Sequence, residues 1–269
     1  NYLLKVLMKI IRNTKELMKF LDSINDLSSS IGLVLTMGNI HAGHLSLVKE
    51  AKSNNKFVIT SIFVNPTQFN NNDDYISYPK TLNKDIAKLR SFNCDLLYLP
   101  SVDEMYPKGL VTEKSILKYR DILCDVGRPG HFDGVTTVVN TFFNIIKPKN
   151  SYFGEKDYQQ MKLIDEMVKI KKLNINIVAC SSIRDKNGMS LSSRNSNFTP
   201  NQYKIFESFA EKINQFVKNL KQKNLKVNFE EFKKELIKIN INKIDYLEIR
   251  NENNLEITSD YSNARLFVA

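Results

Sequence analysis

The stretch "IGLVLTMGNIHAGHLSLVKEA", residues 31–51, decides the fold class of this 269-residue chain. Its first part is a nearly continuous apolar run, which is typical of a strand that is buried on both faces. A helical pattern begins in its last part and runs from His44 to Lys52, one residue beyond the stretch. Gly38 and Gly43 lie between the two parts, where missing side chains let the backbone approach a ligand closely. The stretch therefore predicts a strand, a turn that can face a ligand, and a helix.

The same alternation continues through the first two thirds of the chain. Further strand-like runs cover residues 57–64, 95–100, 151–153 and 175–183. Helix-like runs between them cover residues 81–92, 134–147 and 157–173. Apolar strands that alternate with helices predict an α/β fold, a parallel sheet with helices on both faces. Such sheets bind ligands where loops leave the carboxyl ends of the strands.

The pattern changes near residue 182, where a polar loop leads through Pro200 into a long amphipathic helix. A second helix over 228–239 and strands over 243–250 and 264–269 follow. We therefore expect one domain over residues 1–183 and a smaller α+β domain over residues 184–269 that acts as a lid.

Composition narrows the class of function. No apolar run reaches the roughly 18 to 20 residues of a membrane-spanning helix, so no membrane partner is expected. The net charge of +10 invites a nucleic-acid partner, but the lysines are spread out and no nucleic-acid-binding motif occurs, so we expect none. The three cysteines are widely spaced and lie in apolar surroundings, which is typical of buried thiols in a reducing cytoplasm.

His41 and His44 admit three interpretations: a metal pair, a structural pair, or groups that bind phosphate. A zinc site usually needs further ligands, but only His131 remains and the cysteines lack ligand spacing. A helix N-terminus after a first strand attracts phosphate through its N–H groups and dipole. The histidines can donate hydrogen bonds to phosphoryl oxygens there, so we favour a phosphate role.

Four other loops hold residues suited to small anionic or polar ligands. Asn65 and Gln68 follow a buried strand and have amide groups for hydroxyl or carboxylate groups. The glycine-rich loop at Arg128 and His131 suits either an anion or a structural elbow. A third loop is "FGEKDYQQ", residues 153–160, in which Lys156 suits a phosphate and Asp157 suits ribose hydroxyls or Mg²⁺.

The last of these loops, "MSLSSRN", covers residues 189–195 at the expected domain junction. Arg194 is a fixed charge, and Ser192 and Ser193 are directional donors for the outer phosphates of a triphosphate. Ser-Ser-Arg is a weak signal alone, but together with the H-x-G-H pattern it indicates a two-part nucleotide site.

Several motifs in register resemble the pantothenate synthetase (pantoate–β-alanine ligase) family of the nucleotidyltransferase superfamily. They are "TMGNIHAGHLSLV", "SIFVNPTQF", "YPKTLNKD", "RPGHFDGVTTVV", "YFGEKDYQQM" and "GMSLSSRN". The resemblance implies a Rossmann-like fold, a cytoplasmic homodimer, and ATP-dependent ligation with Mg²⁺. Pantoate would attack the α-phosphate of ATP to give pantoyl adenylate, and β-alanine would then displace AMP to give pantothenate.

The resemblance also assigns site residues. His44, His41, Lys156 and Arg194 would be catalytic, with His44 as the proton donor. Gln68 would bind pantoate and β-alanine, Gln160 would bind pantoate, and Asp85 would lie near Mg²⁺. From its place after the strand, Asn65 is also expected to bind substrate. The ATP site would comprise Met37, Gly38, Asn39, Ile40, His41, Ala42, Gly43, His44, Gly154, Glu155, Lys156, Asp157, Ile183, Leu191, Ser192, Ser193 and Arg194.

The chain departs from the family pattern in places. Leu35 and Asn70 stand where Pro and Gly are usual, and because Asn tolerates a positive φ we expect adjusted loops with retained chemistry. The family usually continues beyond "ARLFVA", which suggests a trimmed or shortened lid domain. Two other hypotheses remain: a related nucleotidyltransferase that transfers CMP or AMP to a phosphorylated alcohol, and a basic RNA-binding module.

Overall fold

The computed structural model describes residues 8–24, 30–114, 116–221 and 228–269, and it divides the chain into two compact units. The first unit comprises Asn1–Lys118 with Arg128–Ile183, and the second comprises Tyr119–Gly127 with Arg184–Ala269. The second unit therefore takes in one segment, Tyr119–Gly127, from inside the domain that we expected over residues 1–183.

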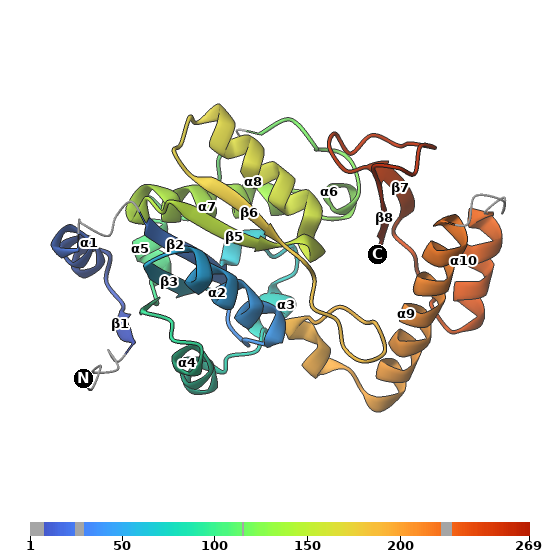
Figure 1. The fold of residues 1–269 in the computed structure, drawn as a ribbon, viewed down its shortest axis with the longest axis horizontal. Coiled ribbons are helices and arrows are strands. Elements are labelled where there is room, and N and C mark those ends of the chain that lie inside the picture. The colour runs from blue at the N-terminus through green and yellow to red at the C-terminus, as the bar shows by residue number, and fades with distance from the viewer. Residues whose placement is uncertain (1–7, 25–29, 115, 222–227) are drawn as a thin grey trace. The chain divides into compact units, whose positions relative to one another are not determined.

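A six-stranded parallel sheet is the centre of the first unit (Figure 1). Its strand order is β1-β4-β3-β2-β5-β6, and every neighbouring pair is parallel. The strands are β1 (Lys9–Ile11), β2 (Ile31–Thr36), β3 (Phe57–Ile62), β4 (Leu96–Tyr98), β5 (Asn150–Gly154) and β6 (Asn176–Cys180). The predicted parallel α/β fold is confirmed.

Helices cover both faces of this sheet, and α2 packs against α4 while α7 packs against α1 and α8. Val34 and Val58 of the strands share one buried core with Val48 of α2 and Leu89 of α4. Adjacent strand residues point to opposite faces, so the fully buried Leu33 and Ile59 pack on the other face of the sheet. The helices are α1 (Thr14–Ser23), α2 (Ala42–Asn54), α3 (Asn72–Ile76), α4 (Leu82–Ser91), α5 (Val102–Met105), α7 (His131–Ile146) and α8 (Tyr158–Ile170).

The strand order places the two expected phosphate loops side by side. β2 lies between β3 and β5, so the chain leaves β2 toward one side of the sheet and later returns to its other side. The loops after β2 and β5 thus flank the point where the strand order reverses, and open α/β sheets bind ligands at this point. These loops hold His41 and the short helix η3 (Glu155–Asp157).

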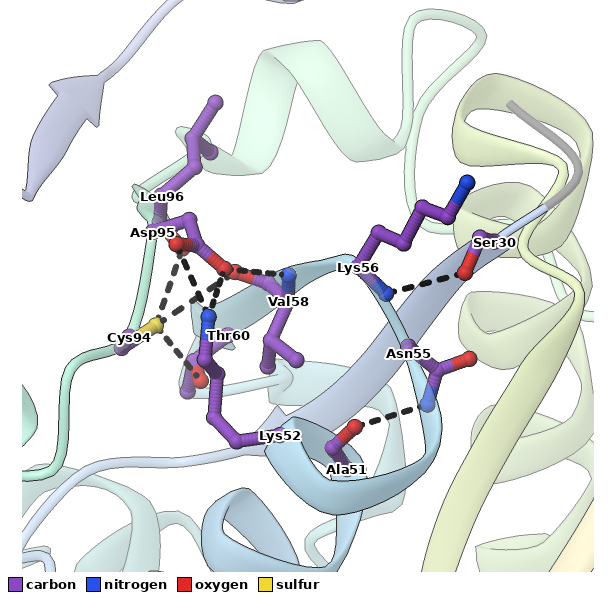
Figure 2. A network of polar contacts seen from close by, with 10 residues as sticks. All are labelled: Ser30, Ala51, Lys52, Asn55, Lys56, Val58, Thr60, Cys94, Asp95 and Leu96. Atoms are coloured by element: carbon purple, nitrogen blue, oxygen red, sulfur yellow. Dashed lines mark hydrogen bonds and ion pairs between the residues drawn. The ribbon is translucent and has the colours of Figure 1, made fainter. Parts of the chain in front are cut away.

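At the amino ends of the strands, opposite the expected ligand site, the polar network shown in Figure 2 stabilises the sheet. Asp95 precedes β4, and its carboxylate accepts hydrogen bonds from Lys52 Nζ and from the Val58 N–H, both at 2.7 Å. The Cys94 thiol donates to Thr60 Oγ1 at 3.2 Å. This network ties the amino ends of β3 and β4 to α2, far along the strands from the expected ligand edge.

The second unit has the predicted α+β composition. Its elements are α6 (Cys124–Gly127), the short helix η4 (Ser193–Asn197), α9 (Pro200–Lys221), α10 (Phe229–Lys238), and the antiparallel strands β7 (Leu247–Asn251) and β8 (Ala264–Val268). Phe216, Phe232 and Leu236 form its apolar core together with Leu247. Within the described ranges of both units, every helix is too short or too polar to cross a membrane.

Candidate active site

The two histidines form a reciprocal cap at the start of α2. The helix begins at Ala42, two residues before its expected start, because His41 is its N-cap. The Gly43 N–H donates to His41 Nδ1 at 3.1 Å, and the His41 N–H donates to His44 Nδ1 at 3.3 Å. Each Nδ1 is an acceptor, so the neutral rings carry their proton on Nε2. Both side chains therefore have an Nε2–H group for a ligand.

Burial and nearby lysines keep these rings neutral. Burial lowers the pKa of His44 to about 3, and His41, Lys156 and Lys88 add to this effect. Burial also lowers the pKa of His41 to about 4, again with contributions from Lys156 and Lys88. At neutral pH the pair thus donates hydrogen bonds as uncharged imidazoles, and the positive charge of the site comes from the lysines.

The glycines of this loop have specific steric roles. Gly38 has a φ of +89°, and a Cβ there would lie 3.1 Å from Ile62. A Cβ on Gly43 would lie 2.8 Å from Cε1 of His41, too close for the ring to stay in place. We expected both glycines to let the backbone approach a ligand; the structure shows that they also fit the turn and the His41 ring.

Asp85 braces the same loop from α4. Its carboxylate accepts the N–H groups of Asn39 at 3.0 Å and Ile40 at 2.8 Å, and the hydroxyl of Thr81 at 3.1 Å. The residue is 1% exposed. In the described part of the chain, no group of three His, Cys, Asp or Glu side chains is placed to hold a metal ion. This geometry gives Asp85 a structural role, and its expected place near Mg²⁺ stays a prediction.

The side chain of Asn65, after β3, is buried and joins several segments by hydrogen bonds. Its amide oxygen accepts hydrogen bonds from the hydroxyls of Tyr106 at 2.6 Å and Thr67 at 3.0 Å, and its amide nitrogen donates to Gln68 Oε1 at 3.1 Å and to the Gly134 carbonyl at 3.2 Å. Only 1% of the residue is exposed. Both amide atoms are used within the protein, which gives Asn65 a positioning role, and its expected substrate contact stays a prediction.

The side chain of Gln68 connects Asn65 to the histidine loop. Its Oε1 is held by Asn65, and its Nε2 donates to Met37 Sδ at 3.0 Å. The amide of Gln68 therefore has a defined orientation beside the loop that leads to His41. This placement agrees with the predicted role of Gln68 in binding a polar substrate but does not test it.

The glycine-rich segment before α7 forms a structural elbow. His131 is buried and its Nδ1 donates to the Gln68 carbonyl at 2.6 Å, while Asn70 donates to the Pro129 carbonyl at 2.7 Å. A Cβ on Gly134 would lie 2.3 Å from the Thr67 carbonyl oxygen, so only glycine allows this approach. Asn70 does not have the positive φ that we expected for it.

The loop after β5 brings Gly154, Glu155, Lys156 and Asp157 to the same edge of the sheet as the histidines. The ammonium of Lys156 lies 3.6 Å from the Asp157 carboxylate, and its charge acts on both imidazoles. Gln160 lies in the first turn of α8, and Ile183, beyond β6, is 37% exposed.

The other predicted ATP-site residues belong to the second unit. Ser192 caps η4 by accepting the Arg194 N–H at 3.3 Å, and Ser193 begins this helix. Asp185, which the sequence did not single out, organises the preceding turn: its carboxylate accepts the N–H groups of Asn187 and Met189, each at 2.9 Å. Leu191 lies between this turn and η4.

Comparison with known proteins identifies the family. A family model described as pantoate-beta-alanine ligase matches residues 9–269. The chain belongs to the pantoate–β-alanine ligase family. Among relatives of this family, the pantothenate synthetase of Thermosipho africanus is 41% identical over 256 residues, which cover 93% of this chain and 90% of the relative. That of Acetivibrio thermocellus is 37% identical and covers 97% of this chain and 94% of the relative.

Solved structures of the ligase family agree with this assignment. The pantothenate synthetase of Thermus thermophilus has a TM-score of 0.85 and 33% identity, and the match covers 97% of this chain and 94% of that one. The pantoate-beta-alanine ligase of Francisella tularensis, complexed with beta-gamma ATP and beta-alanine, has a TM-score of 0.80 and 41% identity, with 90% and 89% coverage.

In this member of the ligase family, the sequence did not point to two residues that contact the site through others. Tyr106 bonds to Asn65, and Lys88 of α4 donates to the Ile40 carbonyl. One signal was available for Lys88: it lies three residues after Asp85 and so shares its helix face. The contact of Tyr106 joins distant segments and leaves no local pattern.

Proposed function

We propose that this chain is an AMP-forming ligase that joins pantoate to β-alanine to give pantothenate, through a pantoyl-adenylate intermediate. Family membership and the related structure with beta-gamma ATP and beta-alanine support this function. The single observation that carries it is the neutral histidine pair, whose Nε2–H groups stand at the start of α2 beside the reversal point of the sheet.

In the first step, a carboxylate oxygen of pantoate bonds to the α-phosphorus of ATP, and the bond to the leaving pyrophosphate breaks. Such phosphoryl chemistry needs positioning and charge stabilisation more than covalent help from the protein. We assign Lys156 to the charge on the phosphates. His41 and His44 would donate Nε2–H hydrogen bonds that strengthen as charge builds up on the phosphate oxygens.

In the second step, the neutral amine of β-alanine attacks the acyl carbon of the adenylate. The new C–N bond forms, AMP leaves with the bridging oxygen, and the amine releases a proton. The oriented amide of Gln68 is assigned to pantoate and β-alanine, and Gln160 to pantoate, with hydrogen bonds that hold the two reactants in line.

The proposal also includes Ile183, at the end of the first unit, and residues of the second unit. Ile183, Leu191, Ser192, Ser193 and Arg194 would complete the ATP site, with Arg194 as a fixed charge and the serines as donors. Residues 184–269 would act as a lid that protects the mixed anhydride from water. Mg²⁺ would arrive with ATP. We also propose a cytoplasmic homodimer, as in our expectation from the sequence.

The decisive experiment is product analysis with purified protein. AMP and pyrophosphate should appear in equal amounts, and AMP formation should require pantoate, β-alanine and ATP together for multiple turnovers. A related nucleotidyltransferase would instead accept a phosphorylated alcohol and make no pantothenate. If no pantothenate forms with all three substrates, the proposed function is wrong.

A further inference from the structure

Two side chains of α4 hold the residue that precedes the histidine cap. Asp85 Oδ1 accepts the Ile40 N–H at 2.8 Å, and Lys88 Nζ donates a hydrogen bond to the Ile40 carbonyl. Asp85 and Lys88 lie three residues apart on one helix face. Both backbone polar groups of Ile40 are therefore bound to the same helix.

The position of Ile40 gives this contact its significance. Ile40 is 1% exposed and directly precedes His41, the N-cap of α2. The His41 N–H in turn donates to His44 Nδ1. The orientation of the Ile40 backbone is thus transmitted through His41 to His44, and a displacement of Ile40 would move both rings.

We propose that Lys88 is a positioning residue for the adenylation step: by holding the Ile40 carbonyl, it fixes the turn from which His41 and His44 present their Nε2–H groups. This inference rests on the proposed function. Lys88 is half-buried and differs from Lys156, which we assign to the substrate phosphates.

The charges around the pair support a second part of this role. The charged groups that act on the rings are Lys88 on α4 and Lys156 and Asp157 on η3, while Asp85 of α4 binds the loop that precedes His41. Lys88 lowers the pKa of each histidine, after burial and Lys156 for His41, and after burial, His41 and Lys156 for His44. A cation at this place favours neutral rings, and a neutral ring with an occupied Nδ1 has one defined donor.

The test uses Lys88→Met, which removes the charge and the donor but keeps an unbranched side chain. Lys84→Met is the matched control, because Lys84 is exposed on the same helix. The chain has three histidines, so ¹⁵N NMR can follow each ring. In the wild type, His41 and His44 should show the Nε2–H form, and His131, whose Nδ1 donates to Gln68, should show the other tautomer.

In Lys88→Met we expect the titration midpoints of His41 and His44 to rise by about 0.5 pH unit or more. We also expect kcat to fall about tenfold or more, because misplaced donors reduce transition-state stabilisation. Lys88→Arg should restore most of kcat, and Lys84→Met should match the wild type. If Lys88→Met does not fold, Lys88→Gln, which keeps a donor and loses the charge, must show the same rise.

Two results would overturn the inference: histidine signals unchanged in the variant that lacks the charge, whatever its kcat, or an equal effect of Lys84→Met. The outcome is separable from that of the proposed function. If the wild type makes no pantothenate, the ligase assignment fails, while the histidine signals still show whether Lys88 positions the pair.

Discussion

At the scale of single residues, the site depends on which nitrogen of each imidazole accepts a hydrogen bond from the backbone. The N–H groups at the start of α2 bond to the Nδ1 atoms, which leaves both protons on Nε2. The capping bonds and the proposed catalytic hydrogen bonds thus use opposite sides of the same rings. This answers the question of the pair's role: it is structural through Nδ1, and we propose that it binds phosphate through Nε2.

The lowered pKa of His44 predicts a specific loss of stability in acid. Its pKa is about 3 in the folded chain and 6.5 in the reference state, so below pH 6.5 the unfolded chain binds a proton that the folded chain does not. The free energy of unfolding should fall with a slope of at most about 1.4 kcal/mol per pH unit from this residue. Urea unfolding between pH 7 and 5 should show a weaker slope in His44→Asn.

Above pH 8, where His44 is neutral in both states, the slopes of the two proteins should coincide. Equal slopes between pH 6.5 and 5 would contradict the deduced neutral state of this ring.

Gly43→Ala tests the fit of the His41 ring. The new Cβ would lie 2.8 Å from Cε1 and 2.9 Å from Nδ1 of that ring, so the ring must move and lose its cap. We expect kcat/KM for ATP to fall on the order of 100-fold, as for a misplaced catalytic group. The control is Gly127→Ala, where a Cβ would meet nothing within 4 Å. Steady-state kinetics that show similar activity for both variants would refute this role.

At the scale of elements, a directional chain of hydrogen bonds joins α5 to the histidine loop. The Tyr106 hydroxyl donates to Asn65, Asn65 donates to Gln68, and Gln68 donates to Met37. Because the oxygen of Asn65 faces Tyr106 and Thr67, its nitrogen must face Gln68. Tyr106, two hydrogen bonds away from Gln68, thereby sets which end of the Gln68 amide points to Met37.

Tyr106→Phe should therefore affect the substrates that we assign to Gln68. We expect KM for pantoate and for β-alanine to rise about tenfold, with KM for ATP changed much less, and a stability loss of about 1 kcal/mol. Tyr98→Phe is a matched control, since its hydroxyl lies 2.7 Å from that of Thr14 on α1. It should lose similar stability at unchanged KM; the same KM changes in both variants would disprove the relay.

The elements of the site were largely predictable, and their side-chain contacts were not. The pattern of apolar residues and the positions of the glycines predicted β2, the turn and α2, because these signals are local. The sequence places the amide of Asn65 at the end of a strand, but its burial among Tyr106, Thr67 and Gly134 depends on distant segments. Asp85 was expected near Mg²⁺, and only the fold shows that its carboxylate is used by the loop.

At the scale of the whole molecule, strand order explains how distant loops meet. Residues 37–44 and 154–157 are far apart in sequence, but β2 and β5 pair in the sheet, so the loops that follow them share one edge. Alternation predicted a parallel sheet but did not give this order. The inclusion of Tyr119–Gly127 in the second unit was likewise beyond local sequence patterns.

The most direct test of the central claim is an isotope transfer. Pantoate labelled with ¹⁸O in its carboxylate is incubated with the protein, ATP and β-alanine, and the AMP is analysed by mass spectrometry. Because the attacking carboxylate oxygen stays on phosphorus when the amine displaces AMP, the account predicts one ¹⁸O atom in each AMP. Unlabelled AMP, or ADP with label in inorganic phosphate, would contradict the pantoyl-adenylate route.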